Sequence, residues 1–251
     1  MRLVLAMSIM ALVVGERLSA AVDTLRDTSD VVDAVIYSWS DCNPETVGED
    51  CRRYNGGRVV NMGVGNQGFD LERRIVVSLP GWDGTVPDSS HFLIYCYTQL
   101  NSTPRNILMY PLTSPFLEGN ESAYGLGDYP DPDSGATWMH RYLDYGQADS
   151  ASWETPGGDY TTSVGCTTLV DKTGRYFAFR EFNRILEYWD STGHSYGFIL
   201  INENLFPSGT SNKVIKSSEA GQYYWPMVLM FHSDSSTAVP VRRKHACGQL
   251  F

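Results

Sequence analysis

The stretch Val31-Val-Asp-Ala-Val-Ile-Tyr-Ser-Trp39 alternates apolar and polar residues and is rich in β-branched and aromatic side chains. A period of two places alternate side chains on opposite faces of a strand, so this pattern predicts a half-buried strand. Similar runs follow along the chain, and most of the Gly and Pro residues lie between them. The later predicted strands are 58–64, 74–79, 91–99, 107–112, 160–170, 175–182, 197–202, 213–217 and 226–232.

One segment departs from the strand pattern. Within residues 182–190 the apolar side chains recur at helical spacing, at Phe182, Ile185, Leu186 and Trp189. This spacing predicts one or two helical turns that cover an open end of the strands. Roughly ten strands with one short helix predict an all-β fold, a β-sandwich of the jelly-roll type with one short capping helix.

The N-terminus has the composition of an export signal. Arg2 precedes the apolar run Leu3–Gly15, which is too short to span a bilayer, and small residues follow at Ser19-Ala-Ala21. We therefore expect residues 1–21 to be a signal peptide that is cleaved after Ala20 or Ala21. A buried N-terminal helix is the alternative, but polar sequence without a helical period follows at once.

The rest of the chain is expected to form one secreted domain. No later segment is apolar enough to insert into a membrane, so we expect an extracellular or cell-surface location. The domain is predicted over residues 31–232, and residues 233–251 are predicted to form a C-terminal tail. The chain has 29 acidic and 19 basic residues, a net charge of −10. This excess repels phosphate groups and argues against nucleic acids and anionic membranes as partners.

The five cysteines fall into three groups. Cys42 and Cys51 bracket a turn-rich loop and form the expected disulfide in an exported protein. Cys96 and Cys166 lie in predicted strands, where they either pair or remain buried thiols. Cys247 is left over, and an odd cysteine permits a link to another molecule, so self-association is a possible outcome.

A cluster of aromatic residues marks the candidate binding region. It comprises Gly135-Ala-Thr-Trp-Met-His-Arg-Tyr142 and Trp153-Glu-Thr-Pro-Gly-Gly-Asp-Tyr160. Aromatic rings on a rigid β scaffold can cover the C–H face of a sugar while nearby polar groups bind its hydroxyls. Arg141 is suited to a uronate carboxylate. The segment between the two tryptophans is predicted to be mostly loop. The candidate carbohydrate-binding residues are Trp138, Arg141, Tyr142, Tyr145, Trp153 and Tyr160, with a core position as the alternative for each tryptophan.

Carboxylates in and near this region raise the question of calcium. Asp128, Asp131 and Asp133 alternate in the long polar segment 113–134, and Asp159 follows two glycines. Together they are candidate ligands for a structural calcium ion, although the spacing is not that of an EF-hand loop. The competing interpretation is a solvated acidic loop, with Asp159 satisfying backbone amides in a tight turn. No other cofactor is indicated.

Several motifs occur in an order that resembles a known family. They are Asp-Ala-Val-Ile-Tyr (33–37), Arg-Arg-Ile-Val-Val-Ser-Leu (73–79), Ala-Thr-Trp (136–138), Trp-Glu-Thr-Pro-Gly-Gly-Asp-Tyr (153–160), Phe-Asn-Arg-Ile-Leu-Glu-Tyr-Trp (182–189), Gly-Phe-Ile-Leu (197–200), Ser-Ser-Glu (217–219) and Pro-Met-Val-Leu-Met-Phe (226–231). Their order resembles the DNRLRE-type domains, also called carbohydrate-binding module family 96 and related to the repeats of disaggregatase. The resemblance covers residues from about 31 to 232 and implies a jelly roll of exported polysaccharide-active or cell-surface proteins. The chain differs from that pattern in its extra cysteines and its long 113–134 segment, and we expect a stand-alone module with no catalytic domain beside it.

These observations favour an exported, non-catalytic module that binds a polysaccharide by aromatic stacking. A structural cell-surface or matrix protein of the same fold is one alternative. A polysaccharide lyase or hydrolase is another, for which His140, Arg141 and Tyr142, or Glu181 and Glu187, would have to act together. Adjacent residues of a strand point to opposite faces, and neither set matches a recognised catalytic signature.

Overall fold

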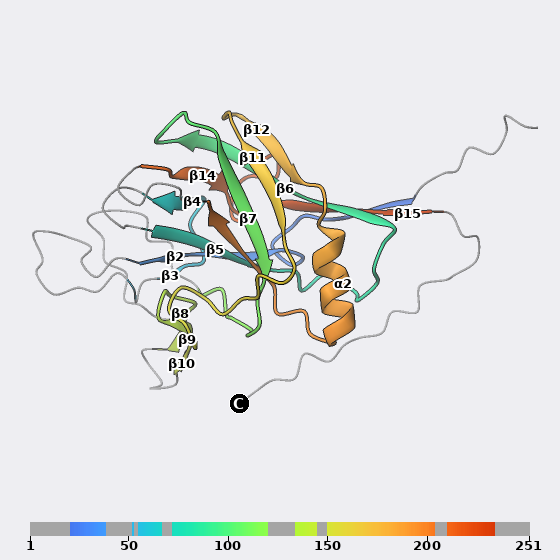
Figure 1. The fold of residues 1–251 in the computed structure, drawn as a ribbon, viewed down its shortest axis with the longest axis horizontal. Helices are drawn as coiled ribbons and strands as arrows, with labels where there is room; N and C mark the ends of the chain where they lie inside the picture. The colour runs from blue at the N-terminus through green and yellow to red at the C-terminus, as the bar shows by residue number, and fades with distance from the viewer. Residues whose placement is uncertain are drawn as a thin grey trace, which may run out of the picture.

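The computed structural model describes residues 21–38, 52, 55–66, 72–119, 134–144, 150–203 and 210–233. These residues form a two-layered β structure with one helix, so the predicted all-β sandwich with a short helix is confirmed (Figure 1). The strands form a large, curled antiparallel sheet of twelve strands and a small sheet of three.

The large sheet folds into two layers. One layer contains β12 (Arg175–Phe179), β6 (Ser89–Gln99), β14 (Lys213–Lys216) and β4 (Asn61–Asn66), and β15 (Met227–His232) and β1 (Ala21–Leu25) extend it beside the first half of β6. The other layer contains β3 (Asn55–Gly56), β2 (Val32–Tyr37), β5 (Glu72–Ser78), β13 (Phe198–Asn202), β7 (Arg105–Pro111) and β11 (Cys166–Val170). The layers are continuous where β4 pairs with β5.

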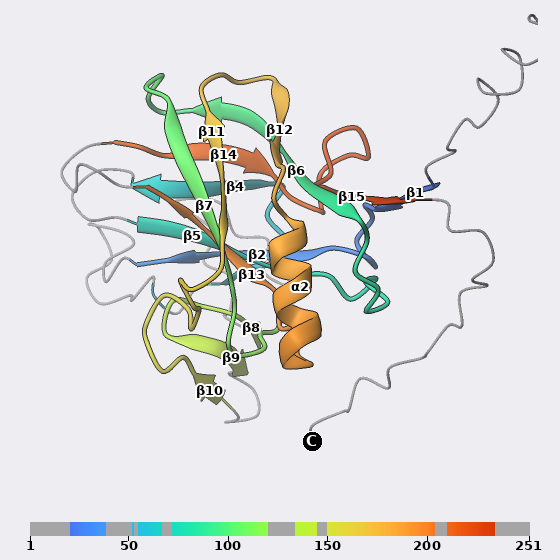
Figure 2. The same cartoon turned by 45° about the vertical axis from the view of Figure 1, so that its right-hand side comes forward.

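The opposite edge of the sandwich is open. At this edge β11 pairs with β7 in one layer, and β12 pairs with β6 in the other. No strand pairing between β11 and β12 is found among the described residues. Helix α2 (Asn183–Thr192) lies at this edge and contacts both β6 and β7 (Figure 2). Ile185, Leu186 and Trp189 are buried, as their spacing predicted, and the helix ends at Gly193 in the left-handed conformation.

The main core fills the space between the layers. Its centre is a group of aromatic rings in which Phe92 of β6 meets Phe198 of β13 edge to face at 4.9 Å, and Trp189 of α2 stacks on Phe198 at 6.3 Å. Edge-to-face and offset rings at such distances stabilise a core beyond simple burial. The helix therefore closes the sandwich by inserting its apolar face among the rings of both layers.

The outer face of the second layer is also covered. Ala34 and Ile36 of β2, Val76 of β5 and Ile199 of β13 point away from the main core, yet all are fully buried. They are covered by the region of the small sheet, which consists of β8 (Ser134–Gly135), β9 (His140–Asp144) and β10 (Ser150–Ser152). The expectation of mostly loop between the two tryptophans was therefore wrong, because His140–Asp144 forms the central strand of this cover.

Several further expectations can be compared with these residues. Each predicted strand has a counterpart, but the one expected from residue 160 begins only at Cys166, because Tyr160 makes an isolated bridge with Leu112. Cys96 and Cys166 are buried free thiols. Cys42, Cys51 and Cys247 lie outside the described residues, as do residues 1–20 and 234–251. No helix in the described part of the chain has the length and hydropathy needed to cross a membrane.

Candidate functional site

The two tryptophans expected to stack on sugar rings are core residues. Trp138 is 9% exposed and Trp153 is 4% exposed, and both pack on Ile36, Val76 and Ile199 beneath the small sheet. The indole N–H of Trp153 donates to the carbonyl oxygen of Thr137 at 2.8 Å inside this cluster. Neither ring offers a free face to a ligand in this structure, so the expected stacking role of Trp138 and Trp153 is corrected to a packing role.

Arg74 explains why Trp138 is held so tightly. Its guanidinium lies 4.7 Å from the centroid of the Trp138 ring and donates to the carbonyl oxygen of Gly157 at 2.9 Å. The Gly157 N–H in turn donates to the carbonyl oxygen of Trp138 at 2.6 Å. Gly157 has a φ of 93°, and a Cβ there would lie 2.7 Å from the indole. The Pro-Gly-Gly-Asp turn is therefore shaped to close over the tryptophan.

Asp159 belongs to the same turn. Its two carboxylate oxygens accept the backbone N–H groups of Glu154 at 3.0 Å and Thr155 at 2.8 Å. Asp159 therefore satisfies backbone amides in the turn, and this role uses both of its oxygens. No cluster of three or more potential metal ligands occurs among the described residues. Asp128, Asp131 and Asp133 lie outside them, so their part of the calcium hypothesis stays a prediction.

The remaining predicted residues are not gathered into one site. Tyr160 stacks on Tyr110 at 5.6 Å and is half-buried. Arg141 is half-buried on β9 and donates to the carbonyl oxygen of Pro115 at 3.4 Å. Tyr142, next to Arg141 on β9, is also half-buried, and Tyr145 lies outside the described residues. Because Arg141 and Tyr142 are adjacent on a strand, they cannot converge on one ligand from the same face.

The structure instead gathers four tyrosines, two exposed and two half-buried, on the outer face of the first layer. Tyr95 and Tyr97 come from β6, Tyr176 comes from β12, and Tyr224 comes from the loop 217–226 that leads into β15. Tyr95 contacts Tyr176 edge to face at 5.2 Å and Tyr224 at 4.8 Å. With Lys216 of β14, these four residues form what we name the tyrosine platform.

A β-bulge interrupts the pairing of β6 with β14 at Tyr97. Along β6, Thr98 pairs with Val214 and Cys96 pairs with Ile215, so Tyr97 is the extra residue opposite that step. Bulges of this kind re-aim side chains and are common beside functional sites. Tyr97 points outward because it directly follows the buried Cys96 and shares a strand face with Tyr95, and it is 52% exposed.

Lys216 connects the rings of the platform. Its ammonium lies 4.1 Å from the centroid of the Tyr97 ring and 5.8 Å from that of Tyr224, and it donates to Asn61 Oδ1 at 2.7 Å. Partial burial lowers the pKa of Lys216. An ammonium has three donors, so a lysine with one strong acceptor retains donors for an incoming polar ligand.

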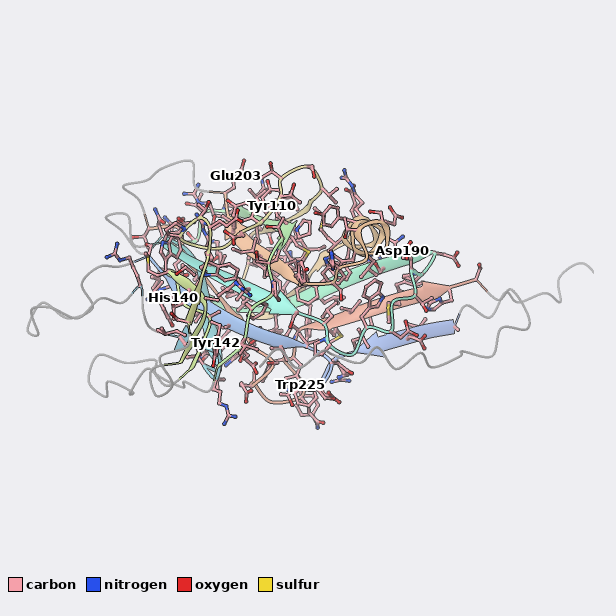
Figure 3. All side chains as sticks on the ribbon, turned by 90° about the horizontal axis from the view of Figure 1, so that it is seen from below. Tyr110, His140, Tyr142, Asp190, Glu203 and Trp225 are labelled. Carbon is pink, nitrogen blue, oxygen red and sulfur yellow. The ribbon has the colours of Figure 1, made fainter. Side chains whose placement is uncertain are left out.

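The loop 217–226, which we name the platform loop, is tied to its surroundings. The Tyr176 hydroxyl donates to the carbonyl oxygens of Tyr223 at 2.8 Å and Trp225 at 3.2 Å. Arg26 donates to the carbonyl oxygen of Gln222 at 2.6 Å, and its guanidinium lies 5.8 Å from the Trp225 ring. Figure 3 shows Trp225 on the opposite side of the body from Tyr110 and Glu203. These contacts fix the platform loop to its surroundings. Tyr224 within it is 40% exposed.

Below the base of this loop lies a buried carboxyl group. Asp33 of β2 is 0% exposed, and burial raises its pKa to about 8. Burial likewise raises the pKa of Glu118 to about 7, with the Glu219 carboxylate adding to the rise. The platform loop begins at Ser217, immediately before the residue whose N–H donates to Asp33.

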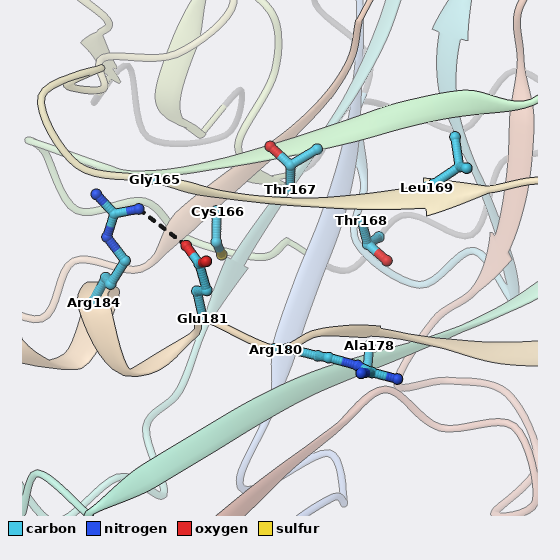
Figure 4. Close-up of a pocket in the computed structure, with 9 residues that line it drawn as sticks. All are labelled: Gly165, Cys166, Thr167, Thr168, Leu169, Ala178, Arg180, Glu181 and Arg184. Carbon is cyan, nitrogen blue, oxygen red and sulfur yellow. Dashed lines mark hydrogen bonds and ion pairs between the residues drawn. The ribbon is translucent and has the colours of Figure 1, made fainter.

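A cleft lies at the open edge between β11 and β12 (Figure 4). It has a volume of about 410 Å³. Burial and the nearby Glu181 carboxylate raise the pKa of the Cys166 thiol to about 12, and Arg184 holds Glu181 at 3.0 Å. A thiol with such a pKa stays protonated and is a poor nucleophile. The cleft is lined by Gly165, Cys166, Thr167, Thr168, Leu169, Ala178, Arg180, Glu181 and Arg184.

The comparisons with known proteins add no assignment. The chain matches no protein-family model, and no curated protein is found to be similar to it. The function must therefore be argued from the geometry of the chain itself, together with the motif resemblance.

Proposed function

We propose that the protein is a secreted, non-catalytic carbohydrate-binding module that recognises a polysaccharide at the tyrosine platform. The observation that carries this proposal is the grouping of Tyr95, Tyr97, Tyr176 and Tyr224 around Lys216 on one outer face. The motif order that resembles carbohydrate-binding module family 96 supports the same class of function.

The geometry suits a sugar chain better than a small apolar ligand. The rings lie on a sheet face and on its adjoining loop, where an extended chain can pass across them. The face of a phenol ring can pack against the C–H groups of a sugar, and its hydroxyl can bind at the edge. Lys216 and Asn61 add polar groups beside the rings. A shallow surface of this kind binds one chain weakly and gains strength when several modules engage one polymer.

Two truncations test the proposal. We expect Tyr97→Ala and Tyr224→Ala each to weaken polysaccharide binding about tenfold, which corresponds to about 1.4 kcal/mol, because each removes an exposed ring. Affinity electrophoresis against soluble β-glucan, mannan, xylan, alginate and pectate measures this effect. Tyr97→Phe is the matched control, since it keeps the ring, and it should bind within about twofold of the unmodified protein.

The outcomes separate the alternatives. If all three variants bind as tightly as the unmodified protein, the sugar site lies elsewhere. Failure of the folded protein to retard on any of these polysaccharides would sink the carbohydrate proposal and leave a structural role as the better hypothesis. Release of reducing or unsaturated ends during the same incubations would show catalysis and exclude a purely binding module.

A further inference from the structure

Asp33 joins three segments of chain that are far apart in sequence. Its own N–H donates to Glu118 Oε1 at 3.3 Å, and its Oδ2 accepts the N–H of Ser218 at 2.8 Å. Residues 118 and 218 are separated from it by 85 and 185 positions. Asp33 thus links β2 to the segment before the small sheet through its backbone N–H, and to the first residues of the platform loop through its carboxyl group.

The contact is incomplete when the carboxyl group is charged. Asp33 Oδ1 and Ser218 Oγ are both buried and neither makes a hydrogen bond of good geometry, although the Ser218 side chain is close enough to lower the pKa of Asp33 in part. A buried carboxylate with an unpaired oxygen is costly, whereas a protonated carboxyl adds an O–H donor at that position. The buried surroundings therefore favour the neutral acid.

The charged groups around Asp33 act in the same direction. Glu118, from the segment after β7, and Glu219, from the platform loop, each place a carboxylate close enough to disfavour a second negative charge. The Arg58 guanidinium opposes this effect at Glu118, where it lowers the pKa. The N–H groups that meet these carboxylates favour the charged forms, but burial is the larger effect on both.

The base of the platform loop depends on this contact. Ser217 donates to the carbonyl oxygen of Val60 at 3.2 Å, and Ala220 closes the turn by donating to the carbonyl oxygen of Ser217 at 3.1 Å. Ser218 lies between them and uses its N–H on Asp33. Four to six residues later come Gln222, Tyr223 and Tyr224, so any opening at Ser218 is transmitted along a short stretch of chain to the platform.

We propose that the carboxyl group of Asp33 is a proton-dependent anchor of the platform loop, which holds the loop when it is protonated and releases it when it ionises. The loss of loop order would in turn weaken ligand binding at the tyrosine platform in alkaline solution. This second step rests on the proposed carbohydrate-binding function, whereas the first step does not.

The direction of the pH effect follows from the raised pKa values. In the open or unfolded chain Asp33 titrates near its usual pKa of 3.8, whereas in the closed state its pKa is about 8. The closed state therefore binds more protons between these values, so its stability is fully present below about pH 4 and is lost as the pH rises through about 8. Glu118 adds to this loss, up to about pH 7.

Hydrogen exchange of the ligand-free protein tests the anchor. We expect the protection of amides 217–226, corrected for the intrinsic pH dependence of exchange, to fall at least about tenfold between pH 6 and pH 9. Asp33→Asn cannot ionise and can still accept the Ser218 N–H, so its loop protection should change less than about twofold between pH 7 and pH 9, above the range in which Glu118 titrates. Asp190→Asn, at an exposed helical position, is the matched control and should keep the profile of the unmodified protein.

Each result decides one part of the proposal. A flat protection profile in the unmodified protein, or an equally steep one in Asp33→Asn, overturns the anchor. If Asp33→Asn fails to fold, Glu219→Gln provides the second test, because removing a facing charge lowers the pKa of Asp33 in the closed state, so the fall in protection should be smaller and should end at lower pH. Affinity electrophoresis at pH 6 and pH 9 then tests the second step: a platform that binds no polysaccharide at either pH refutes the proposed function but leaves the anchor result intact.

Discussion

Trp153→Ala is expected to destabilise the protein by about 3–5 kcal/mol without removing the proposed carbohydrate-binding surface. The indole fills the cluster between the small sheet and the second layer, with Ile36, Val76 and Ile199 as neighbours. Truncation leaves a cavity there and deprives the carbonyl oxygen of Thr137 of its 2.8 Å hydrogen bond. For a domain of this size the loss corresponds to a fall in Tm of roughly 6–20 °C.

Thermal and urea unfolding measure this effect, and the matched variant is Trp153→Phe. Phenylalanine retains most of the buried apolar volume but not the indole N–H, so about half of the loss should be recovered. Affinity electrophoresis at a temperature where Trp153→Ala is still folded completes the test. Full stability combined with lost binding in Trp153→Ala would contradict the packing role and restore a direct role in ligand binding.

The sequence also contains a pattern that indicates the burial of these tryptophans. The runs Ala34-Val-Ile36, Ile75-Val-Val77 and Phe198-Ile-Leu-Ile201 are apolar without interruption, whereas a strand with one solvated face alternates. Such runs indicate strands that are buried on both faces and need a cover. The Trp138 and Trp153 segments supply that cover, so aromatic density alone was the wrong guide to an exposed site.

The local sequence pattern was enough to predict the strands and the helix, because their periodicities are set by neighbouring residues. It could not give the tyrosine platform, since Tyr97 meets Lys216 only through the pairing of β6 with β14, which lies more than a hundred residues later. The local signals of that surface were Tyr95 and Tyr97 at a spacing of two, and the sequence Tyr223-Tyr-Trp225 next to a turn. The burial of Asp33 was equally hidden, because it depends on contacts with residues 118 and 218.

A buried lysine offers a second large effect on stability. Lys213 is fully buried at the start of β14, and its ammonium donates to Gln99 Oε1 at 2.7 Å and to the carbonyl oxygens of Asn101 at 2.9 Å and Thr103 at 2.7 Å. All three donors are thereby used, and the bonds join the end of β6 to the connection that precedes β7. Burial lowers the pKa of Lys213, but this set of three acceptors favours the charged ammonium.

Lys213→Met should therefore destabilise the protein by about 2–4 kcal/mol, because it leaves three acceptors without their shared donor. Methionine keeps the length and apolar character of the stem, so the loss reports mainly the hydrogen bonds.

Lys216→Met makes the same change three residues along the strand, where the side chain is only half-buried, and should cost less than about 1 kcal/mol. Urea unfolding compares the two, and hydrogen exchange of residues 100–104 should quicken in Lys213→Met alone. Equal losses in the two variants would mean that the three bonds add nothing beyond a surface lysine, and that the connection from β6 to β7 is held by the backbone pairing of its flanking strands.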